Sequence, residues 1–231
     1  MYPDQFSADE IRHEQAAYMS KVYGWMCGAL ITTGLVAMLV ASNLSLVEII
    51  IGNRFIFYGL LIAEVVCVGY ISRVIQSITA QRAMMLFILY AVLNGLTLSV
   101  IFLVFTAESI ASTFFITAGT FGVMSAYGYF TKKDLTSIGN LALMALIGLI
   151  IASLVNLFLH NETIYWITTY AGILIFVALT AYDTQKVKAM NVIGNEGTEE
   201  DKKEAIMGAL TLYLDFINLF LLLLRVFGRR K

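Results

Sequence analysis

Seven long apolar stretches dominate this chain, and they constrain its fold more than any other feature. A helix needs about 20 mostly apolar residues to cross roughly 30 Å of hydrocarbon, and each stretch is about that long. The stretches lie approximately at residues 22–41, 55–72, 83–105, 109–130, 138–159, 163–182 and 206–227. Only 13% of the residues are charged, about half of the ~25% that is typical of soluble domains. We therefore predict an all-α polytopic membrane protein, with a polar N-terminal tail at 1–21 and one seven-helix transmembrane domain at 22–231.

The remaining composition excludes several classes of protein. The net charge of −1 gives no indication of a nucleic-acid partner. The residues before Val22 are polar, so we expect no cleavable signal peptide. Cys27 and Cys67 lie in apolar stretches, where cysteine usually serves as a small apolar filler. We see no histidine cluster, nucleophile motif or phosphate-binding loop, and we therefore expect neither an enzyme nor a bound cofactor.

The distribution of lysine and arginine indicates the orientation in the membrane. One side would hold ten of these residues: Arg12, Lys21, Arg73, Arg82, Lys132, Lys133, Lys186, Lys188, Lys202 and Lys203. The other side would hold five: Arg54, Arg225, Arg229, Arg230 and Lys231. This bias predicts a cytoplasmic N-terminus. The basic C-terminal tail conflicts with it, so either the tail is tolerated outside or the last stretch is re-entrant. We favour a full span, because 206–227 is long enough.

A few ionisable residues lie inside the apolar stretches, where each costs at least about 2.5–3.5 kcal/mol at the bilayer centre. The sharpest pattern is in the last stretch, where six residues recur at intervals of three and four, all of them polar or small except Leu222. They are Gly208, Thr211, Asp215, Asn218, Leu222 and Arg225. This spacing places them on one helix face and predicts a stripe that faces a polar cavity. The alternative is an interhelical hydrogen-bond seam with no role in transport.

Two aspartates are the leading candidates for a functional site. Asp183 follows the sixth stretch at its cytoplasmic end, and Asp215 lies roughly 13 Å deep in the seventh stretch from the same side. If Asp183 sits slightly within the membrane, the two carboxylates can meet and share a proton, which would make them a pH sensor. Carboxylates are also ligands that Ca²⁺ prefers. The alternative for Asp183 is an ordinary helix-end residue in water.

Two C-terminal segments carry a resemblance to a known family. Thr-Ala-Tyr-Asp-Thr-Gln-Lys at 180–186 and Leu-Tyr-Leu-Asp-Phe-Ile-Asn-Leu-Phe at 212–220 resemble the hallmark segments of the Bax inhibitor-1 (transmembrane Bax inhibitor motif) family. The resemblance implies a central seventh helix wrapped by the other six. It also implies a pH-sensitive calcium leak in a bacterial inner membrane, with calcium as the transported ion. The paired sensor of the family falls on Asp183 and Asp215.

The same resemblance implies a supporting ion pair between Glu64 and Arg225. The family also has a latch arginine near the end of span two, usually on the same face as the glutamate. The candidate here is Arg73, but it follows Glu64 by nine residues and therefore lies on the opposite helix face. Arg73 is either this latch or a simple cytoplasmic anchor under the positive-inside bias.

Three functions compete at this point. The first is the pH-gated calcium leak, in which protons and calcium are the ligands. The second is a regulator that binds another membrane protein, such as a quality-control protease, through the polar N-terminal tail. In that case the carboxylates are structural. The third is a proton-coupled exchanger or a membrane enzyme, and no motif supports the enzyme.

Overall fold

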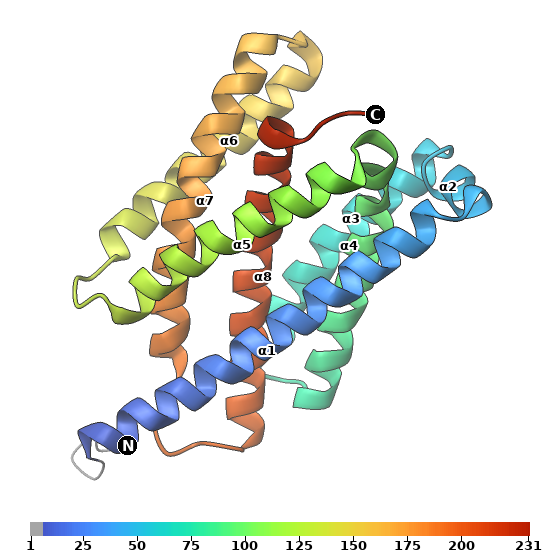
Figure 1. The fold of residues 1–231 in the computed structure, drawn as a ribbon. Coiled ribbons are helices and arrows are strands. Elements are labelled where there is room, and N and C mark those ends of the chain that lie inside the picture. The colour runs from blue at the N-terminus through green and yellow to red at the C-terminus, as the bar shows by residue number, and fades with distance from the viewer. Residues whose placement is uncertain (1–6) are drawn as a thin grey trace. The chain divides into compact units, whose positions relative to one another are not determined.

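The computed structural model describes residues 7–231 as helices joined by short connections (Figure 1). The first six residues of the expected N-terminal tail lie outside the described residues. The described part has eight helices: α1 (Ala8–Ala41), α2 (Leu44–Ile50), α3 (Arg54–Val74), α4 (Ala80–Val104), α5 (Ala107–Phe130), α6 (Thr136–Leu159), α7 (Glu162–Met190) and α8 (Glu199–Phe227). All except the short α2 are long and apolar enough to cross a membrane. The all-α polytopic fold with seven such helices is therefore confirmed.

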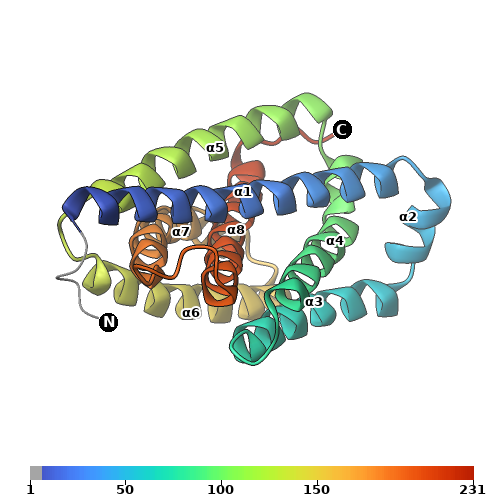
Figure 2. The same cartoon turned by 90° about the horizontal axis from the view of Figure 1, so that it is seen from below.

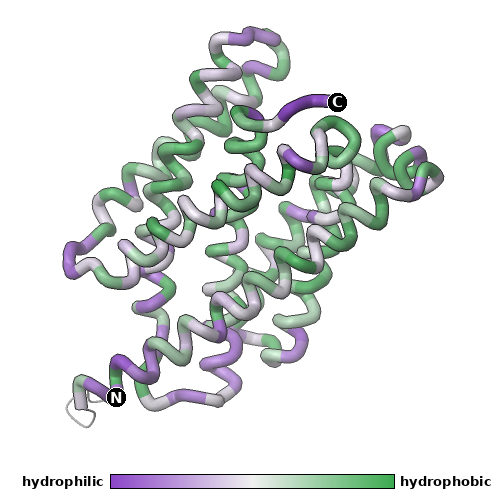
Figure 3. Tube along the Cα trace, viewed as in Figure 1, coloured by the Kyte–Doolittle hydropathy of each residue, from purple (hydrophilic) through white to green (hydrophobic). Residues whose placement is uncertain are grey.

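Helix α1 begins at Ala8, well before its apolar stretch. Ser7 caps it: Ser7 Oγ accepts a hydrogen bond from the Glu10 backbone N–H (3.3 Å), and the Glu10 carboxylate accepts one from the Ser7 N–H (2.7 Å). This capping box satisfies two N–H groups that a helix start would leave unpaired. The 34 residues of α1 would extend about 50 Å, well beyond the hydrocarbon thickness. Its first turns are polar and the rest is apolar (Figure 3).

The chain forms two compact units. The first unit contains α1 to α4 together with residues 188–213, and the second contains residues 106–187 and 214–230. Helix α8 contributes to both, because its first part up to Tyr213 belongs to the first unit and the rest belongs to the second. Whether the two units act as the single transmembrane domain expected from the sequence stays a prediction.

In the first unit, α1 and α3 both pack along α4 (Figure 2). Gly95 of α4 allows a close approach, since a Cβ atom there would lie only 2.8 Å from the Thr33 carbonyl oxygen and 2.7 Å from the Val36 Cβ. Thr33 Oγ1 donates to the Ala91 carbonyl (2.9 Å) and lies 2.7 Å from the Tyr213 hydroxyl. Because Thr33 has one hydroxyl hydrogen, Tyr213 donates the second bond. Thr33 and the close approach at Gly95 therefore hold α1 against α4, and the Thr33–Tyr213 hydrogen bond holds the first half of α8 against α1.

In the second unit, apolar side chains of α6, α7 and α8 form the core. The buried members are Ala142, Phe176, Leu179, Leu219, Leu222 and Leu223. Phe216 of α8 adds an aromatic cluster with two rings of α5, because its centroid lies 5.4 Å from that of Phe114 and 5.5 Å from that of Phe121. The C-terminal half of α8 therefore lies in a core of its own unit.

The long helices differ sharply in burial. The apolar window of α8 is 72% buried, whereas those of α3 and α6 are 6% buried. Phe55 on α3 and Phe158 on α6 are 90% and 86% exposed, which is costly in water and ordinary against lipid. These faces suit contact with the hydrocarbon core. The wrapping of α8 by the other six helices stays a prediction, because α8 runs through both units.

The connection between α7 and α8 corrects one expectation. Residues 183–205 are polar and rich in both charge signs, which predicts a solvated loop, but α7 continues to Met190 and α8 begins at Glu199. No glycine or proline lies between Asp183 and Gly194. Gly194 and Gly197 then adopt φ values of 87° and 81°, which glycine reaches without steric cost. The chain therefore turns through two glycines between the end of α7 at Met190 and the start of α8 at Glu199.

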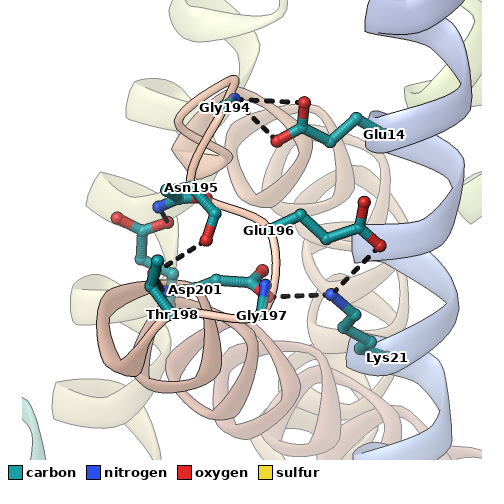
Figure 4. A network of polar contacts seen from close by, with 9 residues as sticks. Glu14, Lys21, Gly194, Asn195, Glu196, Gly197, Thr198 and Asp201 are labelled. Carbon is teal, nitrogen blue, oxygen red and sulfur yellow. Dashed lines mark hydrogen bonds and ion pairs between the residues drawn. The ribbon is translucent and has the colours of Figure 1, made fainter.

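A polar network fastens this short connection to α1 (Figure 4). Lys21 Nζ donates to Asp201 Oδ2 at 2.8 Å, and Asp201 is only 1% exposed. The same Oδ2 atom accepts a bond from the Gly197 N–H (2.8 Å). The Glu14 carboxylate accepts bonds from the Gly194 N–H at 2.8 and 3.1 Å. The polar part of α1 therefore holds the α7–α8 connection through charge-assisted hydrogen bonds.

Candidate functional site

Asp183 and Asp215 meet in the second unit. Asp183 lies about two turns before the end of α7, and Asp215 lies in the middle of α8. The two residues are 9% and 5% exposed, and their carboxyl groups are within hydrogen-bonding reach of each other. The extension of α7 beyond the apolar stretch makes this possible, because Asp183 is part of the helix and not of a loop. The role of the pair as a sensor stays a prediction.

The chemistry of the pair follows from its surroundings. A hydrogen bond between two carboxyl groups requires a proton on one of them, because ionised carboxylates only accept. Asp215 Oδ2 is buried and has no hydrogen-bond partner among the described residues. Lys186, one turn further along α7, is the positive charge that acts on Asp183. The site therefore suits one shared proton or one bound cation, and disfavours two bare charges.

The residues around Asp183 explain the Tyr-Asp-Thr-Gln motif. Thr184 Oγ1 lies 2.9 Å from the Ser125 hydroxyl of α5. Gln185 Nε2 donates to the Lys133 carbonyl (2.8 Å), and Gln185 Oε1 accepts from the Leu135 N–H (2.9 Å). The motif therefore ties α7 both to α5 and to the α5–α6 connection. Gln185 is not predicted by the sequence, since its partners are about fifty positions away and no local pattern marks them.

Two glycines let neighbouring helices close on the motif. A Cβ atom on Gly128 of α5 would overlap the carbonyl oxygen of Ala181, and one on Gly139 of α6 would overlap the ring of Tyr182. By contrast, a Cβ atom on Gly119 or Gly122 of α5 would meet nothing within 4 Å. Small residues allow membrane helices to approach closely, and here the close approach lies beside Asp183.

The expected polar stripe of α8 has local partners. Thr211 Oγ1 donates to the Met207 carbonyl (3.1 Å), and Asn218 Nδ2 donates to the Leu214 carbonyl (2.8 Å). Both bonds run one turn back within α8, so these donors are satisfied without another helix. That the stripe faces a polar cavity stays a prediction.

The other expected site residues are placed as follows. Glu64 of α3 is half-buried in the first unit and accepts bonds from Thr97 Oγ1 (2.6 Å) and Asn94 Nδ2 (3.3 Å) of α4. Arg225 of α8 is exposed in the second unit, with its guanidinium 5.5 Å from the centre of the Tyr165 ring. The Glu64–Arg225 ion pair stays a prediction, because each residue is described within its own unit.

Arg73 lies in the last turn of α3 and is exposed. A positive charge is favourable at this end of a helix, which agrees with an anchor and does not exclude a latch. Among residues 7–231, no group of three or more His, Cys, Asp or Glu side chains is arranged to hold a metal ion. The aspartate pair itself offers four carboxylate oxygens, whereas Ca²⁺ usually takes six to eight oxygen ligands. Calcium binding at the pair stays a prediction.

The fold defines a polytopic α-helical membrane protein with a buried carboxyl pair. The family model described as "Inhibitor of apoptosis-promoting Bax1" matches residues 15–231. The chain therefore belongs to the Bax inhibitor-1 family, which confirms the resemblance seen in its two C-terminal segments.

Several bacterial proteins are similar over nearly the whole chain. "Inner membrane protein YbhL" of Escherichia coli strain K12 is 51% identical over 231 residues, covering 100% of this chain and 99% of that protein. An uncharacterised protein of Rickettsia prowazekii is 46% identical over 219 residues, or 93% of this chain and 90% of its own length. Another from Borreliella burgdorferi is 41% identical over 214 residues, covering 93% of this chain and 92% of that protein.

Proposed function

We propose that this protein is a pH-sensitive calcium leak of the bacterial inner membrane, with Asp183 and Asp215 as its sensor. The observation that carries the proposal is the buried carboxyl pair that joins α7 to α8 within the second unit. Intramembrane carboxylates are expensive, and a functional role is their default explanation. The similarity to a protein named as an inner membrane protein supports the location.

The gating mechanism follows from the three charge states of the pair. With one shared proton, the carboxyl groups hold α7 against α8. With two protons, the pair loses its negative charge and its attraction for Ca²⁺. With none, the two charges repel each other, and only Lys186 offsets them. Flux therefore varies with pH over a range set by the apparent pKa values of the pair, and not by the pKa of either residue alone.

Calcium flux into proteoliposomes, measured across pH, tests the sensor. Asp183→Asn and Asp215→Asn should each flatten the pH dependence, and the double variant should add little to either single one. Glu108→Gln serves as the matched control, since Glu108 is an exposed carboxylate in the first turn of α5. Size-exclusion chromatography checks folding. If both folded single variants keep the parent pH profile, the paired sensor is wrong.

A regulator that binds another membrane protein is the second candidate. The polar start of α1 favours it, because this segment is helical and its Glu14 and Lys21 contact the α7–α8 connection. A partner that displaced these contacts would reach α7 and α8 directly. The regulator predicts no calcium flux in liposomes made from the pure protein, and loss of its cellular activity when the polar segment is deleted. The absence of enzyme activity and of a cofactor stays a prediction.

A further inference from the structure

A cavity of about 940 Å³ lies in the second unit, at the end where α6 meets α7 and α8 terminates. This is close to the upper end of the ~300–1,000 Å³ typical of ligand pockets. Its polar wall includes Asn156 and Asn161, which are held in place by the α6–α7 turn. The Asn161 N–H donates to Asn156 Oδ1 (2.9 Å), and Asn161 Oδ1 accepts from the Ile164 N–H (3.0 Å). The cavity therefore has a fixed rim.

The charges that line this cavity are mainly positive. Arg225 and Arg230 contribute two guanidinium groups, against one carboxylate from Glu162. The Arg225 guanidinium lies over the Tyr165 ring, with its carbon 5.5 Å from the ring centroid, and a guanidinium carries five N–H donors. Within the second unit, neither arginine forms a salt bridge with a described carboxylate. Within the second unit, the two guanidinium groups thus offer N–H donors to an anion.

The apolar part of the cavity opens toward the exposed surface of α6. Leu157 lines the cavity and is 67% exposed, and the adjacent Phe158 is 86% exposed. Trp166 also lines the cavity, and its ring stacks on Tyr170 with centroids 5.9 Å apart. Tryptophan and tyrosine are enriched at the level of the lipid headgroups. A ligand that matches both the basic part and the apolar part of the cavity carries an anionic group next to an acyl chain.

We propose that this cavity binds the phosphate-bearing headgroup of an anionic phospholipid. The phosphate lies between Arg225 and Arg230, and the acyl chain follows the exposed side chains of α6. Basic pockets between transmembrane helices recognise anionic headgroups in this way. The binding is separate from the calcium flux, and neither depends on the other.

Tryptophan fluorescence provides the test, because the chain has only two tryptophans. Trp25→Phe leaves Trp166 as the single reporter in the cavity wall. The full chain is reconstituted in phosphatidylcholine vesicles that contain a small fraction of either brominated phosphatidylglycerol or brominated phosphatidylcholine. Bromine quenches tryptophan only at short range. We expect stronger quenching by the phosphatidylglycerol, with a preference of about fivefold for each arginine that contacts it.

The arginine variants distinguish binding in the cavity from a general attraction of anionic lipid to the positively charged surface. Arg230→Gln should lower the preference about fivefold, whereas Arg229→Gln should leave it unchanged. Arg229 is the matched control, since it is exposed, adjacent and absent from the cavity wall. Glu162→Gln should raise the preference. Equal losses in Arg229→Gln and Arg230→Gln, or equal quenching by both lipids, would overturn the proposal.

Inorganic phosphate tests whether the cavity binds the phosphate of a lipid headgroup or a free phosphate ion. Added at constant ionic strength, it should not relieve the quenching by brominated phosphatidylglycerol, because it lacks the acyl chain that the wall of α6 accommodates. Relief by phosphate would show a site for a free anion and would overturn the assignment to a lipid.

Discussion

At the scale of single residues, Gly128 is the position where the smallest change should have a large effect. Gly128→Ala introduces a methyl group that would overlap the Ala181 carbonyl oxygen two residues before Asp183. Overpacking costs about 1–3 kcal/mol even where side chains can adjust, and here the obstacle is backbone. We expect a lower free energy of unfolding, measured in detergent, and altered flux through the displaced Asp183.

Gly122→Ala provides the control for this substitution. It lies on the same helix, where a Cβ atom meets nothing within 4 Å, and alanine has the higher helix propensity. We expect it to be neutral or slightly stabilising. If the two alanine variants unfold at the same temperature, the close approach of α5 to α7 is not as the structure has it.

The sequence predicted the site residues that are chemically unusual for their surroundings. Asp215 and Asp183 were found because carboxylates are rare in or beside apolar stretches. Gln185 and Gly128 were not found, because glutamine at a helix end and glycine in a membrane helix are both ordinary. Their importance depends on partners in α5 and in the α5–α6 connection, and the sequence does not say which residues those are.

At the scale of elements, the ion pair between Lys21 and Asp201 fastens α1 to the α7–α8 connection. Lys21→Met leaves the Asp201 carboxylate buried without its cation. Breaking a buried pair costs about 3–5 kcal/mol, and the 35% exposure of the Lys21 side chain reduces our expectation to about 1–3 kcal/mol. Amide exchange at Gly197 should become faster, since its acceptor, the Asp201 carboxylate, would no longer be held by Lys21.

The control is Lys202→Met, which removes the same charge from an exposed neighbour of Asp201. It should change neither the unfolding temperature nor the exchange of the Gly197 amide. Equal effects of both lysine variants would mean that general charge, and not the specific pair, holds the connection.

The elements themselves could be predicted where hydropathy decides them. Each apolar stretch lies on one long helix, and only the 83–105 stretch overruns its helix, by Phe105. The larger errors are at polar ends: α1 starts early, α7 continues through Asp183, and α8 starts at Glu199. Hydropathy detects the part of a helix that lipid covers, whereas capping and glycine determine where the helix ends. The seven residues of α2 were missed because they are too few for a periodic signal.

At the scale of the whole molecule, the Glu64–Arg225 pair would connect the two units. Glu64→Gln and Arg225→Met should each lower the thermal stability, and the double variant should recover part of the loss. Because Arg225 is exposed and Glu64 half-buried, we expect a coupling of about 1 kcal/mol. Thermal unfolding of all four proteins gives this value. Strictly additive losses would contradict the pairing.

The orientation in the membrane is the second property of the whole molecule. We expect the N-terminus and the α5–α6 connection, with Lys132 and Lys133, to be cytoplasmic. After replacement of Cys27 and Cys67 by alanine, Lys133→Cys should resist a membrane-impermeant thiol reagent in spheroplasts. Glu108→Cys, at the other end of α5, should react with it. The reverse pattern would invert the topology, and Lys231→Cys reports the side of the basic tail separately.

The division of α8 between the two units has a consequence for biosynthesis. Neither unit contains all of its helices until α8 has been made, and α8 begins only at Glu199 of a 231-residue chain. At roughly 5–20 residues per second, the first seven helices spend several seconds in the membrane before α8, which belongs to both units, has been made. During that time the Asp183 carboxyl group lacks Asp215, and Thr33 lacks Tyr213. A nascent chain released before this last helix would therefore lack part of both units at once.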